Sequence, residues 1–256
     1  MERFPILATV VALIFLLLMP AGAALAGSGS NPRFLTLPFP ETDGMRIQDG
    51  WWRGDMDLHR GLDYINGRIH RPSTWETFPV IAGAGGKACA SADPDRPTCI
   101  TGVGKHVIIR HRVEGRTYYT YYGHLRSIAP EIAVGTGRYE TKVKRGQFIG
   151  WAGKTGNPNT AIHLHFELLT APGQWLDPYD IYDYRAAYPA PTNPAGRACG
   201  PDHFWRECPP QPHLRDDEPP SEDDGPSEDA AASALVLRPS TAPRLMMSRR
   251  RTRRRG

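Results

Sequence analysis

Helical periodicity and strong net charge are both scarce in this sequence. Its 256 residues carry a formal net charge of only +4, so net charge alone indicates no particular partner and gives no reason to expect nucleic acid. Apolar residues at helical spacing are hard to find between Gly27 and about Tyr188, which argues against a helical domain. That region instead alternates short apolar segments with glycine, which predicts one all-β domain of compact antiparallel sheet.

Turn residues mark where the strands of this domain should begin and end. Glu114-Gly115 separates two segments rich in β-branched and aromatic residues, and Arg145-Gly146 precedes a third. The strands that we expect cover residues 107–110, 117–122, 147–151 and 162–168.

Only one long apolar run occurs, at residues 6–19. Arg3 precedes this run, Pro20 ends it, and small residues follow up to Ala26, which is the order of a secretory signal peptide. An uncleaved membrane anchor is the alternative, but it needs about 20 apolar residues. We therefore expect residues 1–26 to be removed, and the chain to be exported to the periplasm, the extracellular space or the cell wall.

Cysteine is also sparse, with four residues in the chain. They form two local pairs, Cys89 with Cys99 and Cys199 with Cys208. An even number of cysteines in an exported chain favours disulfides. A structural zinc site made of four cysteines is the alternative, but neither pair has the short gap usual in such sites. We expect two small loops, each closed by a disulfide.

The composition changes after Pro189. The domain is expected to cover residues 27–188, and residues 189–210 form a proline-rich segment with the second cysteine pair. Residues 211–256 contain an acidic run and then an arginine cluster. Few apolar residues remain to bury, so we expect this tail to be disordered. In an exported chain, the arginine-rich end suits contact with an anionic wall or membrane surface, although a solvated tail without a partner is an equal alternative.

The most informative motif is the alternating segment 162–168. Side chains on a strand repeat every second residue, so His163, His165 and Glu167 should share one face. The apolar residues between them should pack beneath. Two imidazoles on one strand face can point into one site, although a half-exposed strand can also carry two histidines for their polarity alone.

Two further segments supply candidate ligands. His59 and Asp63 would lie about 13 Å apart on a straight strand, too far for one metal with bonds of about 2.0–2.2 Å. The segment must therefore bend, and Gly61 is the residue that permits it. His124 stands at the end of an aromatic run, where a single histidine is usually structural.

In this order, the histidines and the aspartate resemble the lysostaphin-like, or LytM-type, zinc endopeptidases, which have His-x-x-x-Asp early and His-x-His late in the domain. The resemblance covers about residues 44–184. It includes several further segments in the family's order: Gly61 and Tyr64, residues 122–125, 146–150, 153–156 and 163–167.

The resemblance implies that His59, Asp63 and His165 bind Zn²⁺, with water as fourth ligand, in a groove of the antiparallel β-sheet domain. It also implies that His124 and His163 activate the water and stabilise the tetrahedral intermediate, with either histidine in either role. The activity implied is hydrolysis of peptide crosslinks in bacterial peptidoglycan. The crosslink is either direct, through D-alanine, or a glycine bridge.

Two segments depart from the family pattern. Residues 157–162 replace the usual Ser-Thr-Gly-Pro before the late histidine pair. Arg53 and two tryptophans stand where some members have a tyrosine that supports the transition state. These departures bear on substrate preference rather than on metal binding.

Two other functions are compatible with parts of this pattern. A relative without activity could bind peptidoglycan or activate another wall hydrolase, although such relatives typically lack a zinc ligand. A metal site on strands could also serve a lyase or another hydrolase. We interpret the remaining histidines as structural or solvent-facing: His70, His106, His111, His203 and His213.

Overall fold

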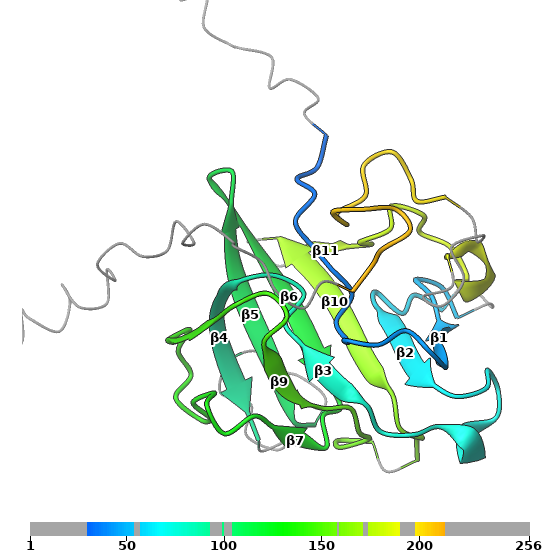
Figure 1. The fold of residues 1–256 in the computed structure, drawn as a ribbon, viewed down its shortest axis with the longest axis horizontal. Coiled ribbons are helices and arrows are strands. Elements are labelled where there is room, and N and C mark those ends of the chain that lie inside the picture. The colour runs from blue at the N-terminus through cyan, green and yellow to red at the C-terminus, as the bar shows by residue number, and fades with distance from the viewer. Residues whose placement is uncertain are drawn as a thin grey trace, which may run out of the picture.

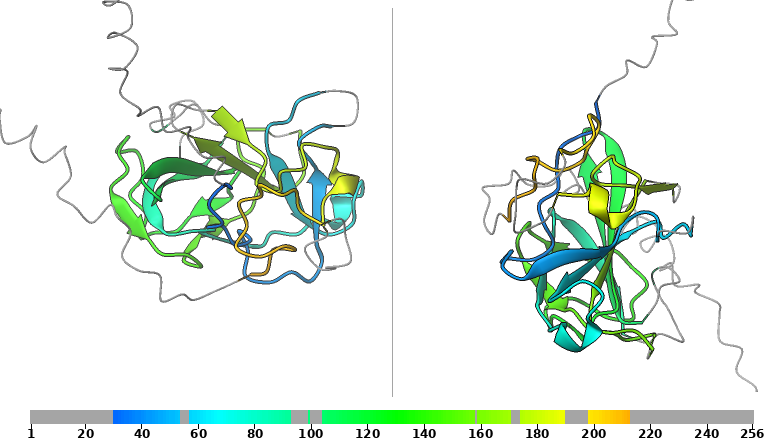
Figure 2. Two further views of the ribbon diagram at one scale, coloured as in Figure 1. Left: turned by 90° about the horizontal axis from the view of Figure 1, so that it is seen from above. Right: turned by 90° about the vertical axis from the view of Figure 1, so that its right-hand side faces the viewer.

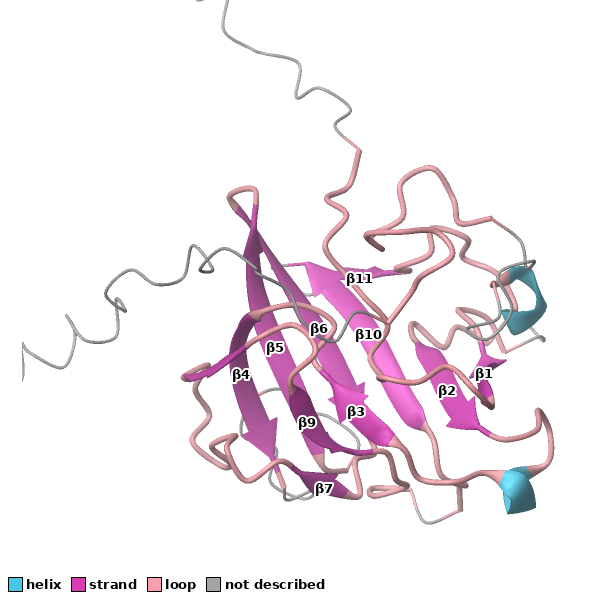
Figure 3. Ribbon diagram, viewed as in Figure 1, coloured by secondary structure: helices cyan, strands magenta, loops and turns pink. Residues whose placement is uncertain are grey.

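The structure is a computed structural model that describes residues 30–53, 57–92, 99, 104–157, 159–170, 174–189 and 198–212. Strands form almost all of its regular structure, and two short 3₁₀ turns complete it (Figure 3). The prediction of an all-β domain is therefore confirmed. The elements are β1 (Met45–Asp49), β2 (Leu62–Asn66), η1 (Pro72–Thr74), β3 (Pro79–Ile81), β4 (Gly86–Ser91), β5 (His106–Val113), β6 (Arg116–Gly123), β7 (Ser127–Ile128), β8 (Thr141–Val143), β9 (Phe148–Trp151), β10 (Leu164–Thr170), β11 (Gln174–Leu176) and η2 (Arg185–Ala187).

The strands form two antiparallel sheets. The larger sheet has the order β1-β2-β10-β6-β5-β4-β8, with β11 also paired to β10, and the smaller sheet has the order β3-β9-β7. The smaller sheet lies against one face of the larger one (Figures 1 and 2). The opposite face of the larger sheet carries a second, smaller buried cluster of Ile108, Tyr121 and Leu169.

The four predicted strands are all present, with ends shifted by a few residues. β5 and β6 are each longer than expected and form a hairpin through Glu114 and Gly115. Both turn residues have positive φ, 51° and 73°, as a two-residue hairpin turn of this twist requires. Arg145 and Gly146 form the turn before β9, as predicted.

The core fills the space between the two sheets. On β10, Leu164, Phe166 and Leu168 are each 0% exposed and point into this core. Burial of each such side chain contributes roughly 1.5–3 kcal/mol. The alternation along β10 therefore anchors one face of the strand in this core and places His165 and Glu167 on the opposite face of the larger sheet.

Two segments far apart in sequence, around Phe34 and around Phe204, pair with each other and complete the core. The backbone N–H groups of Phe34 and Leu35 donate to the Phe204 carbonyl at 2.9 Å. Trp205 is fully buried and stacks on Phe166, with 6.2 Å between ring centroids. The blue and orange segments of Figure 1 show this pairing. Residues 198–212 thus contribute to the core, which the few apolar residues after Pro189 did not indicate.

Both predicted disulfides are present, Cys89–Cys99 and Cys199–Cys208. The first connects β4 to the segment between β4 and β5, and the second closes the loop that carries Phe204 and Trp205. The expected signal peptide and the tail from residue 213 onward lie outside the described residues. Within the described residues, no helix has the length and apolar character needed to cross a membrane.

Candidate functional site

One row of residues crosses the outer face of the larger sheet. Asp49 on β1 pairs with Asp63 on β2, Asp63 with His165 on β10, and His165 with Gly123 on β6. Directly opposed residues of antiparallel strands share a face and approach closely. The sheet register therefore brings Asp63 and His165 together.

The turn before β2 brings in His59. Arg60 has a φ of 64°, so Arg60 takes the left-handed conformation rather than Gly61, where the sequence predicted the bend. Gly61 is needed for space: a Cβ there would lie 2.8 Å from His165 Cε1 and 2.9 Å from the Phe166 carbonyl oxygen. The predicted bend is present. Arg60 provides its left-handed backbone conformation, and Gly61 provides the space for His165.

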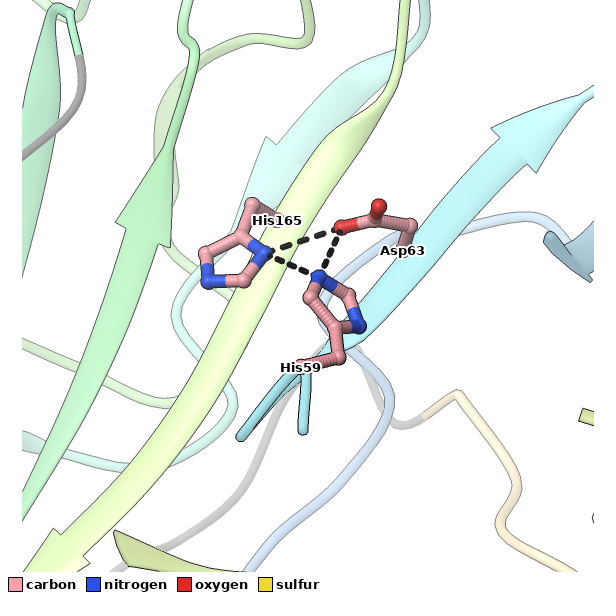
Figure 4. A group of neighbouring side chains, drawn as sticks. All are labelled: His59, Asp63 and His165. Carbon is pink, nitrogen blue, oxygen red and sulfur yellow. Dashed lines mark hydrogen bonds and ion pairs between the residues drawn. The ribbon is translucent and has the colours of Figure 1, made fainter. Parts of the chain in front are cut away.

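Three potential ligand atoms meet at this point (Figure 4). His165 Nδ1 lies 2.9 Å from Asp63 Oδ1 and 3.0 Å from His59 Nε2, and His59 Nε2 lies 3.2 Å from Asp63 Oδ1. All three residues are buried, and their ligand atoms lie within 4.8 Å of one another. Such a group can hold a metal ion.

The outer nitrogens of both histidines suit a metal site as well. His59 Nδ1 donates to the Gly50 carbonyl at 2.9 Å, and His165 Nε2 donates to Glu167 Oε1 at 2.8 Å. Metal-ligating histidines typically donate their second ring N–H to a carbonyl or carboxylate in this way. His59 Nε2 and His165 Nδ1 are therefore the ring atoms left to face a cation, so the residues present fit a metal.

The charges in the group are strongly coupled. Burial would raise the pKa of Asp63, but the His59 charge and the hydrogen bonds from His165 and His59 hold it well below its usual value. Burial would lower the pKa of His165, but its hydrogen bonds to Asp63 and Glu167 raise it to about 10. A metal ion would displace the His165 Nδ1 proton, because ligands must be deprotonated to bind.

His124 and His163 lie beside this group with their rings 4.6 Å apart. His124 Nδ1 donates to the Thr155 carbonyl at 2.8 Å, and His163 Nδ1 donates to the Ala161 carbonyl at 2.9 Å. Each ring therefore keeps the Nε2 lone pair, and His163 Nε2 lies 3.9 Å from Asp63 Oδ1. Burial and the neighbouring His163 lower the pKa of His124 to about 4, so it is neutral at pH 7 and can accept a proton.

These five predicted residues line one cleft of about 580 Å³. Gln48, Asp49 and Arg53 line it too, with Pro72 and Trp75 from the segment around η1 and residues 157 and 159–161. The other described histidines, at positions 70, 106, 111 and 203, are not among the cleft residues. His213 lies outside the described residues.

Sequence reasoning missed several groups that complete the site. The carbonyls of Gly50, Thr155 and Ala161 orient three histidines, and no side-chain pattern reveals a backbone acceptor. Burial raises the pKa of Asp49, as does the charge of Asp63 beside it. Asp49 gave no signal because its place opposite Asp63 depends on the strand register.

Residues 58–178 match the model of peptidase family M23, whereas no curated protein matches the chain. A zinc-containing peptidase from Vibrio cholerae is 25% identical, with a TM-score of 0.35, over 58% of this chain and 39% of its own. Helicobacter pylori Csd3 is 24% identical, with a TM-score of 0.36, over 57% of this chain and 32% of its own. LytU is 23% identical, with a TM-score of 0.34, over 60% of this chain and 89% of its own.

The chain thus spans well under half the length of the Vibrio and Helicobacter proteins. The family match agrees with the resemblance that the sequence motifs indicated, and it supports a metallopeptidase. Residues 58–178 of this chain are thus similar to peptidase family M23.

Proposed function

We propose that this protein is a zinc metalloendopeptidase with His59, Asp63 and His165 as its metal ligands. The observation that carries the proposal is the meeting of these three ligand atoms in the lining of one cleft. Two imidazoles and one carboxylate form the donor set of many catalytic zinc sites, which keep the fourth position open. Glu167 and the Gly50 carbonyl hold the two imidazoles in the orientation that such a site needs.

Zinc, when bound, lowers the pKa of water toward about 7 and polarises the scissile carbonyl. His124 and His163 are the residues of this chain that transfer protons in the reaction. Their Nδ1–H groups are held by backbone carbonyls, so each presents Nε2 to the cleft. One histidine takes the proton of the attacking water on its Nε2. The other stabilises the developing negative charge by donating from Nε2, which requires a proton on that nitrogen as well as on Nδ1. Either histidine can fill either role.

We propose peptide crosslinks of bacterial peptidoglycan as the substrate, with a direct D-alanyl crosslink as the default. The family match supports a peptide bond as the target. The two disulfides indicate an oxidising compartment, and a signal peptide cleaved after Ala26 would place the enzyme outside the cytoplasm with its substrate. The wall of residues 157 and 159–161 and the cation of Arg53 are the cleft features that would set substrate preference.

The test measures zinc content and crosslink cleavage in the same samples. The full chain, its His165→Ala variant and a His70→Ala control, which removes a histidine outside the cleft lining, are digested against purified peptidoglycan. The parent and the control should hold about one zinc per chain, as one catalytic site implies, and release crosslink fragments. The His165→Ala variant should do neither.

Zinc binding by the parent without cleavage of any wall type would contradict the proposed activity. A binding or activating relative, or a different substrate, would then be the better hypothesis. A parent without zinc would contradict the metal centre itself.

A further inference from the structure

Trp175 on β11 makes two polar contacts that reach both halves of the candidate metal site. Its side chain is 37% exposed. Its indole Nε1–H donates to Glu167 Oε2 at 2.9 Å, and the guanidinium of Arg60 lies over its ring at 4.7 Å from the centroid. Trp175 therefore contacts Glu167, which bonds His165, and Arg60, which follows His59 in the chain. It connects the two segments that supply the candidate ligands.

The first contact acts on His165. Glu167 uses Oε1 to accept from His165 Nε2 and Oε2 to accept from Trp175. The terminal torsion of a glutamate is otherwise broad, so a carboxylate with one partner can rotate away from the imidazole. With both oxygens engaged, the carboxylate plane is fixed, and the ring of His165 is fixed with it.

The second contact acts on the turn that carries His59. Arg60 lies between His59 and Asp63 in a left-handed conformation, and its guanidinium packs on the Trp175 ring. A guanidinium over the face of a tryptophan ring is attracted by the ring's electrons, and the attraction strengthens as water is excluded. Arg60 thus connects the ligand-bearing turn to β11.

The strand pairing explains why a side chain is needed here. β2 pairs with β10 at residues 164–166, and β11 pairs with β10 at residues 168–170. Because β6 occupies the other edge of β10, β2 and β11 follow one another along the same edge. Glu167 stands at the junction, where neither strand pairs with β10. Trp175 and Arg60 span this junction with their side chains.

We propose that Trp175 is a positioning residue for the metal centre, which orients His165 through Glu167 and steadies the His59 turn through Arg60. The inference rests on the proposed function, since it concerns the same metal. It assigns Trp175 no contact with substrate, so its effect should appear in metal affinity before any turnover is measured.

The experiment measures zinc affinity of the full chain by competition with a chelating dye. Trp175→Phe removes the indole N–H but keeps a ring beneath Arg60, and Glu167→Gln removes the charge that accepts both bonds. Trp151→Phe is the matched control, because Trp151 is a similarly exposed tryptophan whose ring contact is with Phe148.

Glu167→Gln should weaken zinc binding by about 10- to 100-fold, as loss of a ligand's hydrogen-bond partner usually does. Trp175→Phe, one bond further out, should weaken it by roughly 3- to 10-fold, and Trp151→Phe should leave it unchanged. In the Glu167→Gln background, Trp175→Phe should cost less than about twofold, because coupled residues are not additive. A residue that only stabilises the fold would not show this coupling.

Zinc binding by Trp175→Phe equal to that of Trp151→Phe would overturn the inference, as would fully additive losses. If the parent binds no zinc, the proposed function itself fails. If the parent binds zinc but Trp175→Phe binds it equally well, only the inference about Trp175 fails. If Trp175→Phe does not fold, Arg60→Gln carries the test. It should weaken zinc binding by about two- to fivefold, the size of one exposed cation–π contact, and an unchanged affinity would overturn the inference.

Discussion

The stability of this protein should fall in mild acid because of one buried histidine away from the cleft. His111 on β5 is 0% exposed. Its Nδ1–H donates to the Gly85 carbonyl at 2.7 Å, and its Nε2 lies 2.8 Å from Thr120 Oγ1. Burial lowers the pKa of His111 from 6.5 to about 4, against the hydrogen bond to Gly85 and with the aid of the Arg145 charge.

The direction of the effect follows from which state binds the proton. Below pH 6.5 the unfolded chain protonates this histidine, whereas the folded chain does so only near pH 4. Stability is therefore complete above pH 6.5 and falls as the pH drops toward 4. At 1.36 kcal/mol per pKa unit, the loss from His111 is about 2 kcal/mol at pH 5 and about 3 kcal/mol at pH 4.

Urea unfolding followed by tryptophan fluorescence between pH 7.5 and pH 4 measures this loss. His111→Asn keeps a donor for the Gly85 carbonyl and cannot take the proton. The variant should be less stable at pH 7.5 because of lost packing, but it should lose about 2 kcal/mol less than the parent on acidification to pH 5. Other titrating groups contribute to both proteins and cancel in the difference. Parallel pH curves for parent and variant would refute the reasoning.

Three further changes test the fold and the site. Gly61→Ala places a Cβ 2.8 Å from His165 Cε1, so we expect a loss of about 1–3 kcal/mol in unfolding free energy and weaker zinc binding; a variant with parental melting and zinc affinity would contradict the close approach. Replacing both Cys199 and Cys208 by serine opens a loop of 9 residues' separation and should cost about 2–3 kcal/mol in unfolding free energy, which thermal melting detects. His124→Ala should retain zinc but lose about 10²- to 10⁴-fold in crosslink cleavage; loss of zinc instead would make His124 a ligand.

The strands were predictable because their signals are local. Alternation along residues 162–168 gave the core face and the polar face of β10, since the period of a strand is fixed. The hairpin turn at Glu114 and Gly115 was visible for the same reason. The pairing order of the strands was not, because β2 joins β10 across about 100 residues of chain and no local pattern encodes that register.

The contribution of residues 198–212 to the core was missed for a different reason. Apolar residues there are few, and Phe204 and Trp205 stand among prolines and charges. Composition predicts that a segment is ordered only when many of its residues are apolar and can be buried. Here the Cys199–Cys208 disulfide shortens the loop, and two large aromatic side chains suffice to fill the core next to Phe166.

The same limit applies inside the cleft, where the backbone decides what each imidazole can do. His59, His124 and His163 all give Nδ1–H to backbone carbonyls and keep Nε2 for the cleft, whereas His165 gives Nε2–H to Glu167 and keeps Nδ1. An imidazole offers either nitrogen equally until its other nitrogen has a partner. The sequence can therefore nominate the histidines, but their tautomers follow from carbonyls and a carboxylate that the sheet register and the loops bring into range.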